Sequence, residues 1–193
     1  MRLLPTLLAL LPLTLAVHAG SPAFTESLEG WKFDNAKHWT VKDGVLTCSN
    51  DGGDGDILFT QKDDYTDFEV TVDFKFESGT IDSGIFLRDG KEQIQIGESG
   101  SLKKDMTALP YIPGKSYPIK VDTAEKVMKW KDWNTIKVRV TGNTYTTWLN
   151  GTEIMTYTSD TIAPKGPIGI QVHPKREMKM HYRNLTITDL SHS

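Results

Sequence analysis

The chain has 193 residues, with 22 Lys and Arg against 25 Asp and Glu, so its formal net charge is −3. A single cysteine excludes an internal disulfide framework and a cysteine-based zinc cluster. A mildly acidic chain without a basic block argues against nucleic acid as the main partner. A hydrophobic content of 38% with scattered Pro and Gly excludes a multispan membrane protein and a disordered chain.

Residues 1–19 have the pattern of a secretory signal peptide. An apolar run follows Arg2 and extends to Val17, and small residues at Val17 and Ala19 predict cleavage after Ala19. The run is about 15 residues long, shorter than the roughly 20 that a bilayer-spanning helix needs. We therefore expect a secreted or periplasmic protein with no membrane attachment after cleavage, made of one domain over residues 20–193.

Short β-rich runs separated by turns repeat along the rest of the chain. Residues 68–76 read FEVTVDFKF and alternate strictly between apolar and polar, as a half-buried strand does. Asn150 and Gly151 are typical of a two-residue hairpin turn. Nine or ten strands and no helix of ten residues predict an all-β antiparallel sandwich or barrel. The other expected strands are 44–47, 57–60, 83–88, 92–96, 135–141, 144–149, 168–172 and 178–188.

Residues 99–130 break this pattern with no clear period and a Pro-rich stretch at 109–118. A connection of that length in a small domain is usually functional or packed as a lid. The alternative is a cover over an edge of the sandwich, which Pro-rich segments provide well. Both interpretations stay open at the level of the sequence.

Alternation along three of the expected strands can gather polar side chains on one face of a sheet. Each strand keeps an apolar face for the core, and the polar faces together carry Arg88, Gln93, Gln95, Gln171 and His173. Amides and a guanidinium offer paired donors and acceptors to neighbouring hydroxyls, which is sugar-binding chemistry. The alternative is an ordinary polar outer face of half-exposed strands.

Several motifs occur together and in order between residues 30 and 190. They are DFEV from Asp67, SGIFLR from Ser83, QIQI from Gln93, DMTALPY from Asp105, WN from Trp133, WLNG from Trp148, GPIGIQVH from Gly166 and YRNL from Tyr182. In these motifs the chain resembles the domain of unknown function 1080 group, also called 3-keto-disaccharide hydrolases, among the concanavalin A-like lectin/glucanase sandwiches.

The resemblance implies a curved, two-sheet jelly roll that binds sugar on its concave face and acts on sugars oxidised at carbon 3. Members of the group often carry Tyr-Glu where this chain has Glu92-Gln93. If that Glu is a catalytic acid in the relatives, Glu92 or Glu98 lies nearby in this sequence. The ligand expected for the chain is an oligosaccharide or glycoside.

A ketone at carbon 3 acidifies the proton on carbon 2, and loss of that proton allows elimination of the glycosidic oxygen from carbon 1. We expect His173 to act as the base, because a neutral imidazole can remove and return a proton near pH 7. Arg88 with Gln95 or Gln171 would hold the developing oxyanion. The scheme needs no cofactor, although a divalent metal that polarises the ketone stays an open alternative. The expected substrate-binding residues are Gln93, Gln95, Gln171, Glu98, Lys104, Asp105 and Trp148.

Two other functions fit the same sequence. A non-catalytic carbohydrate-binding module would use the same polar face and the Trp148 ring without forming product, because this fold class hosts lectins as readily as enzymes. An extracytoplasmic interaction protein would use the long 99–130 segment as an interface. Cys48 is expected to be a small buried side chain, and turn chemistry explains the Asp and Gly residues of 50–56 without a metal.

Overall fold

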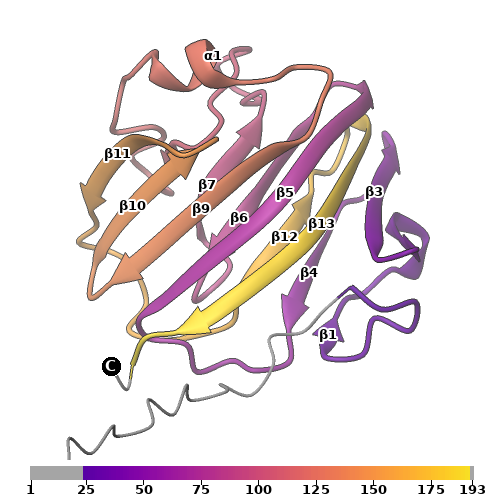
Figure 1. Cartoon of the computed structure of the whole chain (residues 1–193), viewed down its shortest axis with the longest axis horizontal. Coiled ribbons are helices and arrows are strands. Elements are labelled where there is room, and N and C mark those ends of the chain that lie inside the picture. The colour runs from indigo at the N-terminus through magenta and orange to yellow at the C-terminus, as the bar shows by residue number, and fades with distance from the viewer. Residues whose placement is uncertain (1–23, 192–193) are drawn as a thin grey trace, which may run out of the picture.

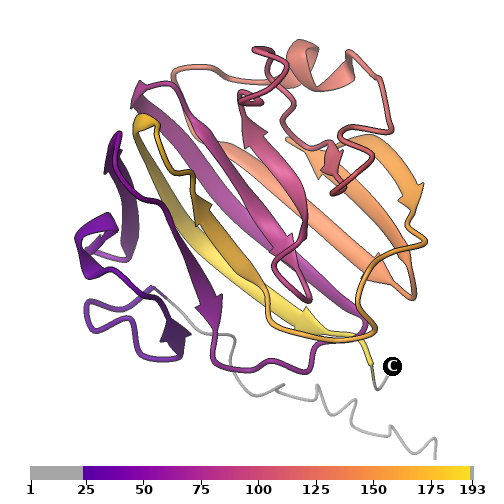
Figure 2. The ribbon, with the colours of Figure 1, turned by 180° about the vertical axis from the view of Figure 1, so that it is seen from behind.

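The computed structural model describes residues 24–191, so the expected signal peptide lies outside the described residues. Two antiparallel sheets form a sandwich, with strand orders β1-β4-β12-β6-β7-β8 and β11-β10-β9-β5-β13-β3-β2. The seven-stranded sheet faces the viewer in Figure 1, and the six-stranded sheet faces the viewer in Figure 2. The predicted all-β, two-sheet architecture is confirmed.

The six-stranded sheet consists of β1 (Trp31–Lys32), β4 (Asp56–Thr60), β12 (Gly169–Val172), β6 (Asp82–Leu87), β7 (Glu92–Gly97) and β8 (Pro110–Tyr111). The seven-stranded sheet consists of β11 (Thr152–Thr158), β10 (Thr144–Leu149), β9 (Asn134–Thr141), β5 (Phe68–Gly79), β13 (Glu177–Asp189), β3 (Val45–Asp51) and β2 (Trp39–Lys42). Two short helices, η1 (Ala36–His38) and α1 (Thr123–Val127), complete the elements of the described chain. None of the helices in residues 24–191 is long and apolar enough to cross a bilayer.

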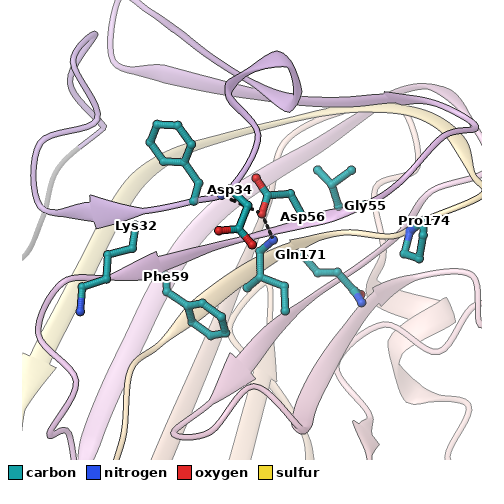
Figure 3. A pocket seen from close by; sticks show the side chains of 10 residues that line it. Lys32, Asp34, Gly55, Asp56, Phe59, Gln171 and Pro174 are labelled. Carbon is teal, nitrogen blue, oxygen red and sulfur yellow. Dashed lines mark hydrogen bonds between the residues drawn. The ribbon is translucent and has the colours of Figure 1, made fainter.

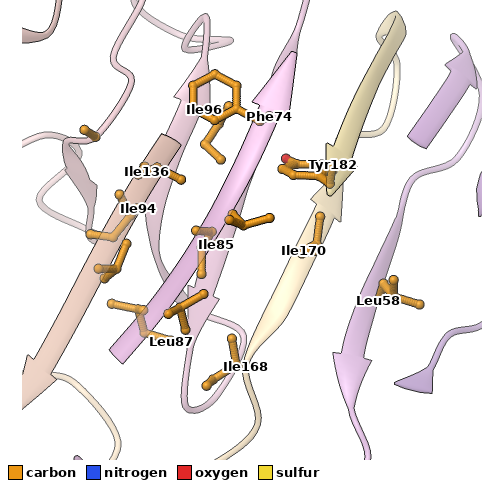
Figure 4. Close-up of a cluster of buried hydrophobic side chains, with 14 of the residues drawn as sticks. Leu58, Phe74, Ile85, Leu87, Ile94, Ile96, Ile136, Ile168, Ile170 and Tyr182 are labelled. Atoms are coloured by element: carbon orange, nitrogen blue, oxygen red, sulfur yellow. The ribbon is translucent and has the colours of Figure 1, made fainter. Parts of the chain in front are cut away.

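The core lies between the two sheets, where each strand turns its apolar side chains inward (Figure 4). Leu58, Ile85 and Ile94 come from the six-stranded sheet, and Phe74 and Ile136 come from the seven-stranded sheet; all are fully buried. Burial of apolar surface contributes roughly 25 cal/mol per Å², so these side chains dominate the stability of the sandwich. Cys48 is buried among them, as predicted, and burial raises the pKa of its thiol.

A buried polar link joins the two sheets behind strand β12. The Ser83 hydroxyl donates to the carbonyl of Gln171 at 2.6 Å. The Tyr182 hydroxyl, from β13, lies 2.8 Å from Ser83 Oγ. Because Ser83 already donates its one proton to Gln171, the Tyr182 phenol is the donor in this bond. Burial raises the pKa of Tyr182, so the link stays protonated and fixes β12 beside β6.

The long segment after β7 covers a sheet edge, which is the second of its two interpretations. Its β8 pairs with β7, with Gln93 opposite Tyr111, and so covers that edge of the six-stranded sheet. It then passes over the end of the sandwich to α1 (Figure 1). Strand β8, and β1 and β2 near the start of the described chain, were not predicted, because two- to four-residue strands carry too little alternation to be recognised.

Candidate functional site

The outer face of the six-stranded sheet carries an ordered grid of side chains. Register places Phe59 opposite Gly169, Gly169 opposite Phe86, Phe86 opposite Gln93, and Gln93 opposite Tyr111. Because side chains in register share a face, this row runs across five strands. Strand β12, from late in the chain, lies between β4 and β6 and so brings the GPIGIQVH motif next to SGIFLR.

A cleft of about 870 Å³ opens over this grid and is bounded by the 89–91 turn, the 99–117 segment and the 173–176 loop. Its volume lies in the range of roughly 300–1,000 Å³ that is typical of small-molecule sites. Its lining includes the side chains of Asp82, Phe86, Gln93, Gln95, Tyr111, Tyr117, Gln171, His173 and Arg176. Four predicted residues therefore meet in one cleft: Gln93, Gln95, Gln171 and His173.

Asp82 and the two glutamines of β7 form a directed chain of hydrogen bonds. Gln95 Nε2 donates to Asp82 Oδ1 at 2.9 Å and approaches the carbonyl of Glu98 at 3.2 Å. Gln93 Nε2 then donates to Gln95 Oε1 at 2.9 Å. Since a carboxylate only accepts, the direction of both amides is set by Asp82. Gly84 leaves room for this arrangement, because a side-chain carbon there would lie 2.9 Å from Gln93 Oε1.

Three acceptor oxygens in this cleft have no hydrogen-bond partner although they are buried. They are Asp82 Oδ2, Gln93 Oε1 and Gln171 Oε1, and two further such atoms in the described chain lie elsewhere. An unpaired buried acceptor costs about 1–3 kcal/mol, so native proteins rarely keep one without use. A ligand that donates several hydroxyl protons would satisfy all three.

His173 stands at the end of β12 with one nitrogen free. Its Nδ1 lies 2.6 Å from the carbonyl of Pro174, and because a carbonyl cannot donate, Nδ1 carries the proton. The lone pair is then on Nε2, which lies 3.8 Å from Asp82 Oδ2. Asn50 from β3 fixes the backbone here by donating to the carbonyl of His173 at 3.0 Å.

Arg176 balances the charge of Asp82, with its Nε 3.4 Å from Asp82 Oδ2. Gly100 makes this approach possible, since a side-chain carbon there would come within 2.6 Å of the guanidinium. Tyr111 and Tyr117 form an aromatic wall with ring centres 5.5 Å apart. Burial raises the pKa of Tyr117 to about 12, so its phenol stays a neutral donor.

Arg88 does not belong to this cleft, which corrects its predicted place beside the glutamines. Strand β6 ends at Leu87, and Arg88 has a left-handed backbone with φ 55°. Its side chain therefore leaves the alternating pattern and is 2% exposed. The guanidinium donates to the carbonyls of Thr66, Gly142 and Ala163. Arg88 thus ties loops of the sandwich together, and no catalytic role is retained for it.

Glu92 faces the interior, on the opposite side of β7 from Gln93. Its carboxylate accepts hydrogen bonds from Tyr145, from Ser159 at 2.9 Å and from Thr161 at 2.6 Å. These three donors engage both oxygens of Glu92, and it does not line the cleft. Glu92 is therefore not placed to supply the catalytic acid that the resemblance suggested for this part of β7.

Three predicted contacts from the start of the long segment also lie away from the cleft. Glu98 and Asp105 line a separate hollow of about 710 Å³ together with Trp130. Lys104 is exposed and approaches Asp122 at 3.4 Å. The segment does reach the cleft, but through other residues, among them Ser99, Tyr111 and Tyr117.

Trp148 lies on β10 in the other sheet, so its predicted place in the substrate site is also corrected. Its neighbours along the strand are buried and it faces outward, as alternation predicted. Lys137 lies 4.1 Å from the centre of the indole ring, and Arg139 lies 5.7 Å from it. These cations occupy the ring on a face that the cleft does not share.

Asp82, Tyr111, Tyr117 and Arg176 were missed by sequence reasoning. Asp82 had a signal, because it precedes Ser83 by one residue and shares the face of Gly84 and Phe86, but the strand was begun too late. Tyr111 lies on the two-residue strand β8, which is too short to show alternation, and Tyr117 and Arg176 come from irregular segments, where periodicity gives no direction. Among residues 24–191, no group of three or more His, Cys, Asp or Glu is arranged to hold a metal ion.

Comparison with known proteins gives the chain a family context. The model of the 3-keto-alpha-glucoside-1,2-lyase-like domain matches residues 22–188. A search of curated protein sequences found no match.

Solved structures share the fold at low identity. One from Parabacteroides distasonis, described as a candidate glycosyl hydrolase, has a TM-score of 0.63 at 22% identity and covers 90% of this chain and 100% of its own. The carbohydrate-binding module CBM66 from Bacillus subtilis has a TM-score of 0.53 at 16% identity, with 82% and 94% covered. The exoplasmic/lumenal domain of VIP36, bound to Ca²⁺ and Man3GlcNAc, has a TM-score of 0.60 at 10% identity, with 83% and 84% covered. The predicted lectin-like sandwich is thereby confirmed.

Proposed function

The chain belongs to the 3-keto-alpha-glucoside-1,2-lyase-like domain family, and from that membership we propose that it cleaves 3-keto-glycosides in the cleft of the six-stranded sheet. The observation that carries the proposal is the free Nε2 of His173 beside Asp82, in a cleft with three unpaired acceptor oxygens. A base next to hydroxyl-binding groups is what elimination from an oxidised sugar requires.

The reaction begins with transfer of the carbon 2 proton to His173 Nε2. The electron pair of that bond moves toward the carbon 3 ketone, giving an enolate. Its collapse forms a double bond between carbons 1 and 2 and expels the glycosidic oxygen with the electron pair of the carbon 1 bond. The leaving oxygen then takes a proton, and addition of water to the unsaturated sugar gives net hydrolysis.

The neighbours of His173 support this step electrostatically. Asp82 lies 3.8 Å from the nitrogen that accepts the proton, so its negative charge stabilises the imidazolium that forms. The Gln95 amide donates a hydrogen bond to Asp82, so Gln95 is a positioning residue for that carboxylate and not a donor to the oxyanion. Gln171, Arg176 and Tyr117 keep donors for the enolate oxygen and the sugar hydroxyls.

An ordinary retaining glycosidase mechanism is less well supported. It needs two carboxyl groups about 5 Å apart across the scissile bond. Among the described residues that line the cleft, Asp82 is the one carboxylate. The base-and-enolate scheme uses a single carboxylate, in a supporting role.

The test is product analysis in heavy water with methyl 3-keto-α-glucoside and its unoxidised counterpart, each with and without chelator. Cleavage of the keto sugar alone, with deuterium at carbon 2 of the product, supports the proposal. Cleavage of both sugars, or of neither, contradicts it. The chelator arms measure any contribution of a divalent metal.

A second candidate is a non-catalytic carbohydrate-binding module. It is favoured by the unpaired acceptors beside the aromatic wall of Tyr111 and Tyr117, an arrangement that binds sugars whether or not a bond breaks. Saturable binding of the keto sugar without product would establish this function. Export by the expected leader belongs to either proposal, and signal-sequence processing in the secreting host would test it.

A further inference from the structure

A second hollow of about 420 Å³ lies beside the cleft, at strands β1, β4 and β12. Gln171 and Pro174 line both spaces, so the hollow continues the cleft across β12. In Figure 3, Asp56, Phe59 and Gln171 lie around the hollow. Phe59 also lies against Phe86 of the cleft, with ring centres 6.4 Å apart, and the two rings form a shared floor.

The lining of this hollow is largely apolar. Phe33, Ile57, Phe59, Val172 and Pro174 contribute it. Phe59 is held in one place, because a side-chain carbon at Gly90 or Gly169 would come within 2.8 Å of its ring. Phe33 is 36% exposed and offers an open aromatic surface on the wall.

Four polar side chains also line the hollow: Lys32, Asp34, Asp56 and Gln171, of which Lys32 approaches Asp63 at 3.8 Å. Asp56 Oδ1 accepts from the backbone N–H groups of Ile57 and Asp34, and its Oδ2 accepts from Asn35 N and from Trp39 Nε1. The Asp56 carboxylate therefore braces the wall and has little capacity left for a ligand. Gln171, at the junction with the cleft, keeps its unpaired oxygen.

This balance favours an aromatic ring over a second sugar. Hydroxyls that enter a largely apolar space without partners lose about 1–3 kcal/mol each. An aromatic ring has no such groups and gains contact with Phe33 and Phe59. The hollow also lies on the side of Gln171 that is away from the cleft. Gln171 is on β12, two residues before His173.

Resting on the proposed function, we propose that this hollow receives the leaving group and that the preferred substrates are aryl 3-keto-glucosides. The sugar ring occupies the cleft with carbon 2 at His173, and the glycosidic oxygen lies at Gln171. When the carbon 1 to oxygen bond breaks, its electron pair stays on the phenolic oxygen, which leaves as phenolate or takes a proton from water. The hollow thus holds a phenol before release.

The test compares Phe33→Ala with the wild-type protein on phenyl 3-keto-α-glucoside, methyl 3-keto-α-glucoside and 3-keto-trehalose. Comparing one substrate between variants cancels the intrinsic reactivity of its leaving group. Loss of the ring contact should lower kcat/KM for the phenyl substrate about three- to ten-fold and leave the methyl substrate unchanged. Trp130→Ala, another exposed aromatic residue that lines a separate hollow, is the matched control and should change none of the three.

Each other result has a defined meaning. An unchanged phenyl value, or an equal loss on phenyl and methyl substrates, overturns the inference. A loss on 3-keto-trehalose as large as on the phenyl substrate overturns the preference for an aromatic group and makes the hollow a second sugar site. If no substrate is turned over, the proposed function fails, and dissociation constants from calorimetry test the hollow separately: the phenyl compound should bind more tightly than the methyl compound, and Phe33→Ala should remove the difference.

Discussion

The outer faces of the two sheets share the same alternating pattern but treat polar groups in opposite ways. On the seven-stranded sheet, carboxylates are paired: Glu69 with Arg139 at 2.7 Å, and Glu77 with Lys179 at 2.9 Å. On the six-stranded sheet, Asp82 Oδ2 lies 3.4 Å from Arg176 Nε but, like Gln93 Oε1, is buried without a hydrogen-bond partner.

This difference indicates which of the two outer faces is suited to bind a ligand. Polar side chains that satisfy each other in solvent are an ordinary sheet surface, and such exposed ion pairs contribute little stability. Buried acceptors without partners carry a cost that folding alone does not repay. Alternation identifies both faces, whereas hydrogen-bond satisfaction separates them.

The largest effect we expect from breaking this contrast is that of Asp82→Asn. The amide keeps the volume but removes the charge that stabilises a protonated His173, so kcat should fall about 100-fold. Glu69→Gln on the other sheet is the matched control and should leave kcat unchanged. Steady-state kinetics make the measurement; an unchanged kcat in Asp82→Asn would remove the carboxylate from the account.

Asp105 sharpens the contrast at the rim, because it is a largely buried carboxylate that belongs to neither face. Burial raises its pKa from 3.8 to about 6, while bonds from Thr107 act in the opposite direction. Because the pKa is higher in the folded state, the folded protein binds this proton more tightly than the unfolded chain does. The contribution of Asp105 to the free energy of unfolding is therefore greatest below pH 4 and is lost as the pH rises through 6. Asp105→Asn removes this titration, so the fall in the free energy of unfolding with rising pH should be about 2 kcal/mol smaller in the variant.

Chemical denaturation at pH 4, 5, 6 and 7 measures the effect of Asp105→Asn. The free energy of unfolding of the wild-type protein should fall relative to the variant over this range. Parallel pH curves for the two proteins would mean that Asp105 has an ordinary pKa. Asp122→Asn, an exposed carboxylate in the same segment, serves as the control.

The sequence predicted the fold and part of the cleft, because strict alternation determines which side chains share a face. Gln93, Gln95, Gln171 and His173 met as expected on that ground. Alternation failed at Arg88, where a left-handed backbone redirects the side chain after β6.

Other errors came from contacts that no local pattern encodes. Nothing in the sequence around Trp148 says which sheet β10 joins, because strand order is set by long-range pairing. Tyr117 and Arg176 reach the cleft from irregular segments, whose direction depends on the whole fold.

A smaller effect is expected for Gln171→Leu, which tests whether the cleft acceptors are kept for a ligand. The Gln171 side chain has an unpaired buried oxygen, so an apolar replacement of similar size should leave the melting temperature unchanged or raise it. Affinity for the keto sugar should fall about five-fold. Calorimetric titration and thermal unfolding make the pair of measurements, and a destabilised variant with full affinity would contradict the interpretation.

The smallest effect is expected for Trp148→Ala. The indole lies on the opposite sheet beneath Lys137 and Arg139, so affinity for the keto sugar should change less than about two-fold. The same titration measures it. A large loss of affinity would place a sugar site on the seven-stranded sheet and end the contrast between the faces.

The central claim is that His173 removes the proton next to the ketone, and solvent exchange at carbon 2 tests it most directly. Proton NMR of methyl 3-keto-α-glucoside in heavy water follows loss of the carbon 2 signal and release of methanol. His173→Ala should reduce both rates at least about 100-fold, whereas His181→Ala, whose imidazole pairs with Glu77 on the other sheet, should leave them unchanged. Exchange at the wild-type rate in His173→Ala would contradict the account.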